Sequence, residues 1–305
     1  MKKIIILIIC SIAILQSYGQ AAKVYFEEGI KKETNRDYTG AIKDFTNAIK
    51  LDSTFSQAYY KRAYMLFMNS KNIEAVNDLN VAIKLNPNGN ADAYLLRAIL
   101  YTSESGNDDV IIFVCSKAIK INPELWGAYL LRGKSKSNLQ NYKSALEDFD
   151  KAIEINPNND DAYFQRGKTK AELNNALGAI VDFTKTIQLN PKNSDAYLLR
   201  GDNKNTLEDY RGAITDYTIF IERIPKYFPA YLLRGLSKNR LEDYRGAISD
   251  YSRVIEINPE YGDAYYLRGR AKIYLNDKNS GCLDLSRAGE LGNKDAYDAI
   301  KKYCN

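Results

Sequence analysis

The amino-acid sequence repeats with a period of 34 residues over most of its length, and this period restricts the possible folds more than any other feature. Most units carry a tyrosine at position 4, a small residue at position 8, an alanine at position 20, an aromatic residue at position 24 and a proline near the end. In the unit spanning 228–261 these markers are Tyr231, Gly235, Ala247, Tyr251 and Pro259. A unit this short cannot bury its apolar side alone, so successive units are predicted to stack into an array.

Each unit has room for two helices joined by a turn near position 14, which predicts an all-α fold. The small residues at positions 8 and 20 are expected to lie where the two helices touch, and the proline stops the second helix because its ring cannot continue it. Asp161, Asp195 and Asp263 precede first helices and are expected to cap them. Eight such units are predicted, at 22–55, 56–90, 91–125, 126–159, 160–193, 194–227, 228–261 and 262–293, followed by a capping helix at 294–305.

Composition excludes several classes of function. The chain has no histidine, which removes the usual general base and the commonest transition-metal ligand. No other metal cluster or nucleophile-base pair stands outside the repeat pattern, so we expect no enzyme, no metal and no cofactor. The 43 basic and 38 acidic residues are too nearly balanced to indicate a nucleic-acid partner.

The first 19 residues have the pattern of an export signal. Lys2 and Lys3 precede an apolar run from Ile4 to Leu15, and small residues follow, so cleavage is predicted after Gly19. The run is shorter than the roughly 20 residues that span a bilayer, so no stable membrane span is expected after removal of the signal. This predicts a protein of the periplasm or cell envelope, or a secreted one.

Two charged positions recur in register: arginine at position 7 and aspartate at position 23. One interpretation makes the arginines a ladder for an anionic ligand. The interpretation we favour pairs each aspartate with the arginine of the following unit, which leaves Arg132 without a partner because Val114 occupies the preceding aspartate position. The predicted pairs are Asp44 with Arg62, Asp148 with Arg166, Asp182 with Arg200, Asp216 with Arg234, and Asp250 with Arg268. Lysine at position 11 is predicted to be solvated beside acidic residues of the following turn.

These residues resemble the tetratricopeptide repeat family, in the variety with an Arg-Gly pair in the first helix, as at Arg132-Gly133 and Arg234-Gly235. The resemblance covers residues 22–293. It implies a right-handed superhelix of helical hairpins whose first helices line a concave groove that binds peptides or proteins. The third unit departs from the pattern, with an extra residue and an apolar run from Val110 to Cys115 that puts regular stacking there in doubt. The leader and the richness in lysine, asparagine and isoleucine are similar to those of Bacteroidetes envelope proteins.

The expected groove is lined by positions 5, 9, 12 and 13 of the first helices, which share one helical face. An apolar position 5 recurs in every unit, and polar residues follow it at the other positions. An alternative is that position 5 packs between neighbouring units. The predicted groove residues are Phe26, Tyr60, Tyr64, Leu95, Leu130, Lys134, Phe164, Lys168, Leu198, Asn205, Leu232, Asn239, Arg240, Tyr266 and Arg270.

Cysteine spacing predicts one disulfide. Cys282 and Cys304 stand on either side of Gly292, so antiparallel helices would bring them close together. A disulfide there fits an exported protein. Cys115 is interpreted as a small buried residue.

The sequence therefore predicts a non-enzymatic protein-interaction scaffold that binds a peptide or protein segment in the groove. Two alternatives remain. Exposed tyrosines would suit a carbohydrate-binding module, and the apolar third unit would suit a structural component of the envelope that forms oligomers.

Overall fold

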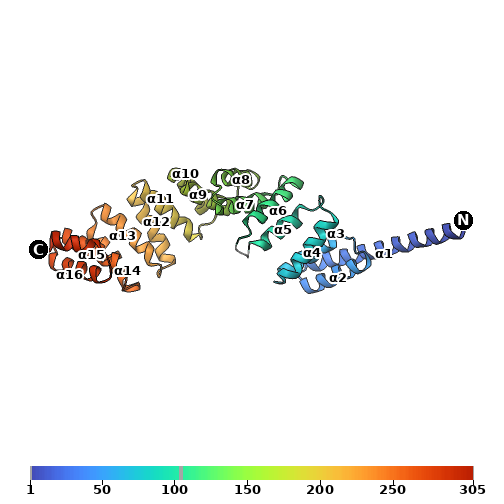
Figure 1. The fold of residues 1–305 in the computed structure, drawn as a ribbon, viewed down its shortest axis with the longest axis horizontal. Coiled ribbons are helices and arrows are strands. Elements are labelled where there is room, and N and C mark those ends of the chain that lie inside the picture. Colours follow the sequence, from blue (N-terminus) through green and yellow to red (C-terminus); the bar gives the residue numbers. More distant parts are fainter. Residues whose placement is uncertain (1, 103–105, 305) are drawn as a thin grey trace. The chain divides into compact units, whose positions relative to one another are not determined.

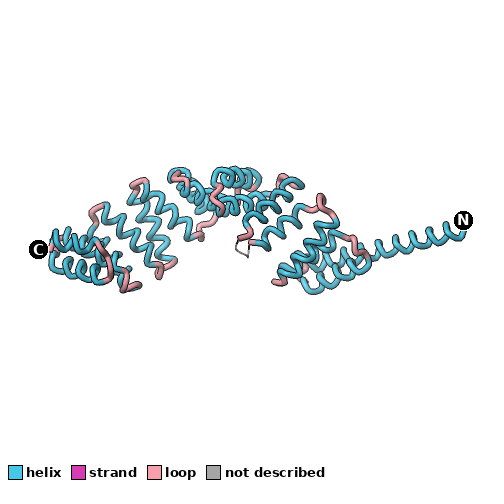
Figure 2. Tube along the Cα trace, viewed as in Figure 1, coloured by secondary structure: helices cyan, strands magenta, loops and turns pink. Residues whose placement is uncertain are grey.

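The computed structural model describes residues 2–102 and 106–304, with side chains described from residue 17 onward. Within these ranges the chain forms helices and no strands (Figures 1 and 2). Contacts divide it into two compact units, residues 1–157 and 158–305. The first unit holds α1 (Lys2–Thr34), α2 (Tyr38–Leu51), α3 (Ser56–Met68), α4 (Asn72–Leu85), α5 (Ala91–Tyr101), α6 (Asp108–Ile121), α7 (Trp126–Asn138) and α8 (Tyr142–Ile155). The second unit holds α9 (Asp160–Glu172), α10 (Ala176–Leu189), α11 (Ser194–Thr206), α12 (Tyr210–Arg223), α13 (Phe228–Arg240), α14 (Tyr244–Ile257), α15 (Gly262–Tyr274), α16 (Lys278–Glu290) and α17 (Asp295–Tyr303).

The helices up to α16 pair into antiparallel hairpins, and every pair except α5 with α6 is joined by the same tight turn, with one left-handed residue. At the end of α13 the Asp243 amide donates to the Lys238 carbonyl at 3.0 Å and the Glu242 amide to the Asn239 carbonyl at 3.1 Å. This Schellman-type pattern needs a left-handed residue, and Glu242 takes φ 60°. The Asp243 carboxylate then accepts from the Gly246 amide and caps α14.

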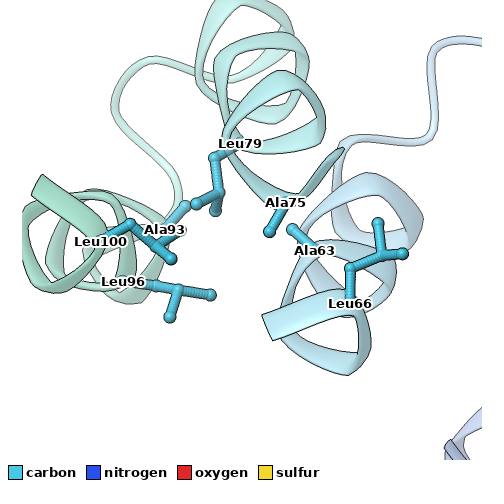
Figure 3. Close-up of a cluster of buried hydrophobic side chains, with 7 residues drawn as sticks. All are labelled: Ala63, Leu66, Ala75, Leu79, Ala93, Leu96 and Leu100. Atoms are coloured by element: carbon cyan, nitrogen blue, oxygen red, sulfur yellow. The ribbon is translucent and has the colours of Figure 1, made fainter. Parts of the chain in front are cut away.

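Glycine at position 8 lets the two helices of a hairpin approach closely. A Cβ built on Gly235 would lie 2.6 Å from Cε1 of Tyr251, the aromatic residue at position 24. The second hairpin has Leu79 at position 24, and there an alanine, Ala63, stands at position 8. Figure 3 shows Ala63 and Leu79 in the cluster that α3, α4 and α5 share.

Residues near each helix end determine where the helix begins and stops, but the caps predicted for the first helices need correction. The second helices from α4 to α14 end two residues before a proline, as α14 does ahead of Pro259. The predicted first-helix caps are wrong: Asn159 and Asn193 accept from the amides of Ala162 and Ala196, while Asp161 lies inside the first turn of α9.

The backbone of α1 is helical from the predicted leader into the first hairpin, which uses residues 22–34. The predicted export signal falls mostly on residues whose side chains lie outside the described part. Among the residues that the structure describes, no helix is both long enough and apolar enough to cross a membrane.

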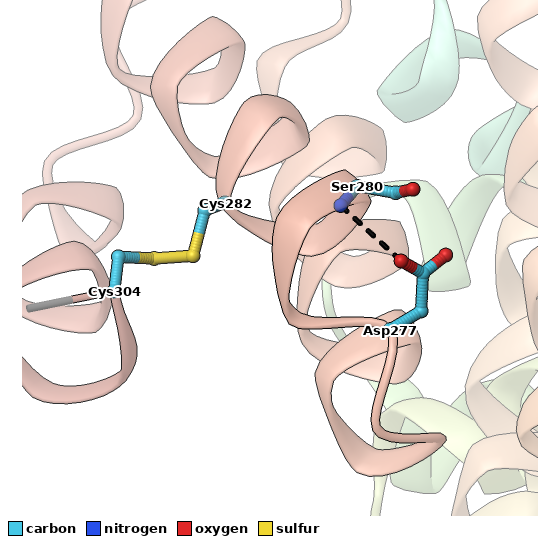
Figure 4. The surroundings of a disulfide bond; sticks show 4 residues. All are labelled: Asp277, Ser280, Cys282 and Cys304. Atoms are coloured by element: carbon cyan, nitrogen blue, oxygen red, sulfur yellow. Dashed lines mark hydrogen bonds between the residues drawn. A yellow bond between two sulfur atoms is a disulfide. The ribbon is translucent and has the colours of Figure 1, made fainter.

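The irregular third unit still forms a hairpin of α5 and α6, which packs on α7. At the other end, α17 covers the last hairpin, packs on α15 and α16, and buries Ala296 and Ala299. A disulfide joins Cys282 on α16 to Cys304 at the end of α17, with a Cα–Cα distance of 5.8 Å (Figure 4). Cys115 is a buried free thiol.

Candidate protein-interaction surface

The first helices of neighbouring hairpins contact one another directly, as α5 does α7, and as α11 does both α9 and α13. We refer to the first helices within each unit as its first-helix layer. In the first unit the layer consists of residues 22–34 of α1 together with α3, α5 and α7. In the second unit it consists of α9, α11, α13 and α15.

Position 5 of this layer packs between hairpins more than it faces outward. Leu130 is only 6% exposed. Leu198 and Leu232 pack against a buried cluster that includes Phe220 and Val254. Phe26 stacks at 4.8 Å on Phe55, from the loop before α3. Leu95 packs against the cluster around Val114, Tyr60 against the cluster around Leu79, and Phe164 against Phe183. The apolar groove wall expected from position 5 is therefore mostly interior.

Polar residues at positions 9, 12 and 13 form the more accessible part of the layer. Lys168 and Arg240 are exposed, and Asn239 and Arg270 are half-buried. None of the three cations lies within 4.0 Å of a carboxylate among the residues that the structure describes. Asn205 differs, because its Oδ1 accepts from the Ser237 hydroxyl at 2.9 Å and so links α11 to α13. Lys134 lines a cavity of about 360 Å³ with Leu131, Asn138 and Asp108.

The predicted ion pairs between successive units are wrong. Six of the seven aspartates at position 23 bind the arginine of their own hairpin, 16 residues earlier, at 2.6–2.8 Å. The pairs are Arg62 with Asp78, Arg132 with Asp148, Arg166 with Asp182, Arg200 with Asp216, Arg234 with Asp250, and Arg268 with Asp284. Asp44 follows the same rule with a different partner, since Lys32 of its own hairpin contacts it at 2.6 Å.

The close approach at position 8 is the physical reason for this pairing. A Cβ on Gly167 would lie 3.2 Å from Cβ of Asp182, so Arg166, the residue before Gly167, is beside the carboxylate. The arginine meets it with two nitrogens, Nε at 2.9 Å and Nη2 at 2.6 Å. Lys170, one helical turn later, reaches the same carboxylate at 2.8 Å.

The lysines at position 11 are therefore part of buried clusters and are not solvated beside the following turn. Five of them contact the aspartate of a complete arginine-aspartate pair at 2.7–2.8 Å. They are Lys136, Lys170, Lys204, Lys238 and Lys272. Toward the preceding hairpin the arginine meets a hydroxyl, as Arg200 does at Thr184 Oγ1 (3.2 Å). We call each set of arginine, aspartate and lysine a charge triad.

Models of the tetratricopeptide repeat match residues 127–159, 149–180 and 228–261. The hairpin geometry and these matches identify the architecture. The chain is a tetratricopeptide-repeat protein.

Several solved tetratricopeptide-repeat structures share this fold. The C-terminal part of a repeat-containing protein from Cytophaga hutchinsonii is 18% identical, with a TM-score of 0.61 over 78% of this chain and 97% of that one. YrrB, described as having an unusual peptide-binding site, is 23% identical, with a TM-score of 0.58 over 61% and 97%. A protein from Parabacteroides merdae ATCC 43184 is 20% identical, with a TM-score of 0.53 over 82% and 99%. A search of curated proteins found no match.

The third tetratricopeptide repeat lacks the charge triad. Val114 replaces the aspartate and Tyr101 the lysine, so Arg97 has no carboxylate within 4.0 Å among the described residues. Its Nη1 donates to Asn80 at 3.2 Å, and its buried Nε has no hydrogen-bond partner there. Arg132, which the sequence left without a partner, has a complete triad. The joint loss of aspartate and lysine in one repeat was the signal in the sequence for pairing within the hairpin.

One carboxyl of the first-helix layer is held in an apolar setting. Burial raises the pKa of Asp202 above its ordinary value, although the hydrogen bond from the Tyr217 hydroxyl, at 2.8 Å, acts in the opposite direction. Burial also raises the pKa of Tyr251, whose hydroxyl has no hydrogen-bond partner among the described residues. No group of three or more carboxylate or cysteine side chains that could hold a metal ion occurs in the described part of the chain.

Proposed function

We propose that this tetratricopeptide-repeat protein is a non-enzymatic scaffold that binds a segment of a partner polypeptide on its first-helix layer. The observation that carries the proposal is the contrast between two sets of cations. Most cations at positions 7 and 11 form ion pairs with buried aspartates of their own hairpin. Lys168, Arg240 and Arg270 instead lie on the accessible face of the layer, with no carboxylate of a described residue within 4.0 Å. Unpaired polar groups on a rigid helical surface suit the recognition of a polypeptide. The peptide-binding site named for YrrB supports the same class of partner.

We also propose that the protein acts outside the cytoplasm, in the periplasm or envelope or as a secreted protein. The leader pattern and the Cys282–Cys304 disulfide support this location. N-terminal sequencing of the protein from its native cell is expected to begin at Gln20. A chain that keeps its leader, or that fractionates with the cytoplasm, would contradict the location.

Site-specific photocrosslinking tests the binding surface with a matched pair of positions. Arg240 ends a first helix and Arg245 begins the next second helix, and both are exposed. With a photoreactive amino acid at position 240, we expect a discrete crosslinked polypeptide in the native envelope. The same substitution at position 245 is expected to give none. Equal crosslinking from both positions, or crosslinking from 245 alone, would reject the first-helix layer as the binding surface.

A further inference from the structure

Arg270 and Arg268 lie two residues apart on α15 but have different surroundings. Arg268 reaches Asp284 with Nε and Nη2, each at 2.8 Å. Arg270 meets only phenols: its Nη1 donates to Tyr266 at 3.4 Å and its Nη2 to Tyr274 at 3.2 Å. Its guanidinium carbon lies 5.5 Å from the centroid of the Tyr266 ring and 5.9 Å from that of Tyr274. Arg270 is therefore positioned by aromatic groups that leave its charge unneutralised.

The capping helix α17, which packs on α15, carries a second cation, Lys302. The Lys302 ammonium lies 4.9 Å from the centroid of the Tyr303 ring. The pKa of Tyr303 is lowered, first by a hydrogen bond with Lys302 and further by the charges of Lys302 and Arg270. No carboxylate of a described residue lies within 4.0 Å of either cation.

We propose that Arg270 and Lys302, framed by Tyr266, Tyr274 and Tyr303, bind a carboxylate on an acidic segment of the partner polypeptide. This rests on the proposed function, because it assigns one anchor point on the first-helix layer. A guanidinium presents paired donors that match a carboxylate. The tyrosine rings offer apolar faces for the methylenes of a glutamate side chain, and Tyr244 extends this surface by stacking on Tyr274 at 5.0 Å.

The disulfide helps to complete the site. Cys304 directly follows Tyr303, so its bond to Cys282 holds the end of α17 on α16. The disulfide therefore adds a covalent tether to the packing of α17 on α15 and α16. Reduction is expected to lower the affinity for the carboxylate to that of a chain lacking the Lys302 charge.

Fluorescence anisotropy with defined peptides tests the assignment. The probe is a fluorescein-labelled (Gly-Ala-Glu)4 amide, with (Gly-Ala-Gln)4 as amide and as free acid for comparison, at low salt. We expect the glutamate peptide to bind at least about tenfold more tightly than the glutamine amide, since charge-assisted hydrogen bonds are about twice as strong as neutral ones. Arg270→Gln should raise its Kd about tenfold, and Lys302→Gln about threefold because that ammonium is more exposed. A free-acid glutamine peptide that binds as well as the glutamate peptide would show that the site reads a chain terminus.

The controls separate local recognition from general charge. Lys301→Gln removes the neighbouring charge on α17, and Arg245→Gln removes an exposed arginine from α14. Both are expected to leave Kd unchanged. If the glutamate and glutamine amides bind equally, or if Arg270→Gln binds like wild type, the inference is wrong. The peptide experiment could fail while crosslinking still occurs from position 240 and not from position 245. That combination would overturn the carboxylate site and leave the proposed function standing.

Discussion

Removing Asp216 tests the charge triads most directly. Its carboxylate is fully buried and binds Arg200 at 2.6 and 2.9 Å and Lys204 at 2.8 Å. Asp216→Ala leaves two cations with little solvent and no counter-charge. Breaking a buried pair from one side costs about 3–5 kcal/mol. At roughly 2–4 °C per kcal/mol for an array of this size, we expect Tm to fall by about 10 °C.

Arg200→Met should cost less, about 1–3 kcal/mol, because Lys204 still neutralises Asp216. A double-mutant cycle then separates the two possible pairings. Coupling between Asp216 and Arg200 is expected to be about 1.5–3 kcal/mol. Coupling between Asp216 and Arg234, the pair that sequence spacing favoured, should stay within about 0.5 kcal/mol because Arg234 binds Asp250.

Urea unfolding followed by circular dichroism at 222 nm gives the free energies for this cycle. All variants should keep the helical signal of wild type in water. Larger coupling for Asp216 with Arg234 than with Arg200 would refute pairing within the hairpin. So would an Asp216→Ala variant as stable as wild type.

Three further predictions concern packing, ionisation and thiols. Gly235→Ala should lose about 1–3 kcal/mol because its Cβ meets the Tyr251 ring, and adding Tyr251→Leu should recover most of that loss in urea unfolding. Asp202→Asn should raise Tm at pH 7, since burial raises the pKa of the native carboxyl and its charge opposes folding. The difference in Tm between variant and wild type should shrink as pH falls through that raised pKa, because wild-type Asp202 then takes up a proton. A difference in Tm that grew as pH fell would contradict the raised pKa. Burial raises the pKa of Cys115 to about 12, so Ellman's reagent should find no thiol in the native mature chain and one after denaturation; a second thiol would indicate retention of Cys10, and two additional thiols an open disulfide.

The fold was predictable because its determinants are local and repeated. Each hairpin has a small residue where its helices cross, and most have a proline after the second helix, and both recur in register. At Gly235 with Tyr251, and at Ala63 with Leu79, the small residue at position 8 lies where the side chain at position 24 packs.

The pairing of charges was not predictable from spacing alone. Offsets of 16 and 18 residues each bring an arginine opposite an aspartate, across the turn within a hairpin or the turn between hairpins. The distinction depends on how near the two helices lie at Gly167, which is a tertiary quantity. Only the third repeat indicated the pairing, because Tyr101 and Val114 stand there in place of the lysine and the aspartate.

The interaction surface was predictable in part. Helical spacing placed Lys168, Arg240 and Arg270 on the accessible face, but it could not tell that Leu130 would be buried. Lys302 was missed because α17 lies outside the repeat, where register carries no information.

The two classes of cation explain how such an array can keep one fold and still vary its partner. The charge triad uses positions 7, 11 and 23, and its buried bidentate contacts specify the register of each hairpin even where they add little net stability. With the register specified internally, positions 9 and 13 need not supply the charges that specify it. They accordingly diverge from repeat to repeat, as Lys168, Asp202, Leu236 and Arg270 do at position 9. Specificity should therefore be altered by substitutions at position 9, whereas substitutions at position 7 should alter stability first.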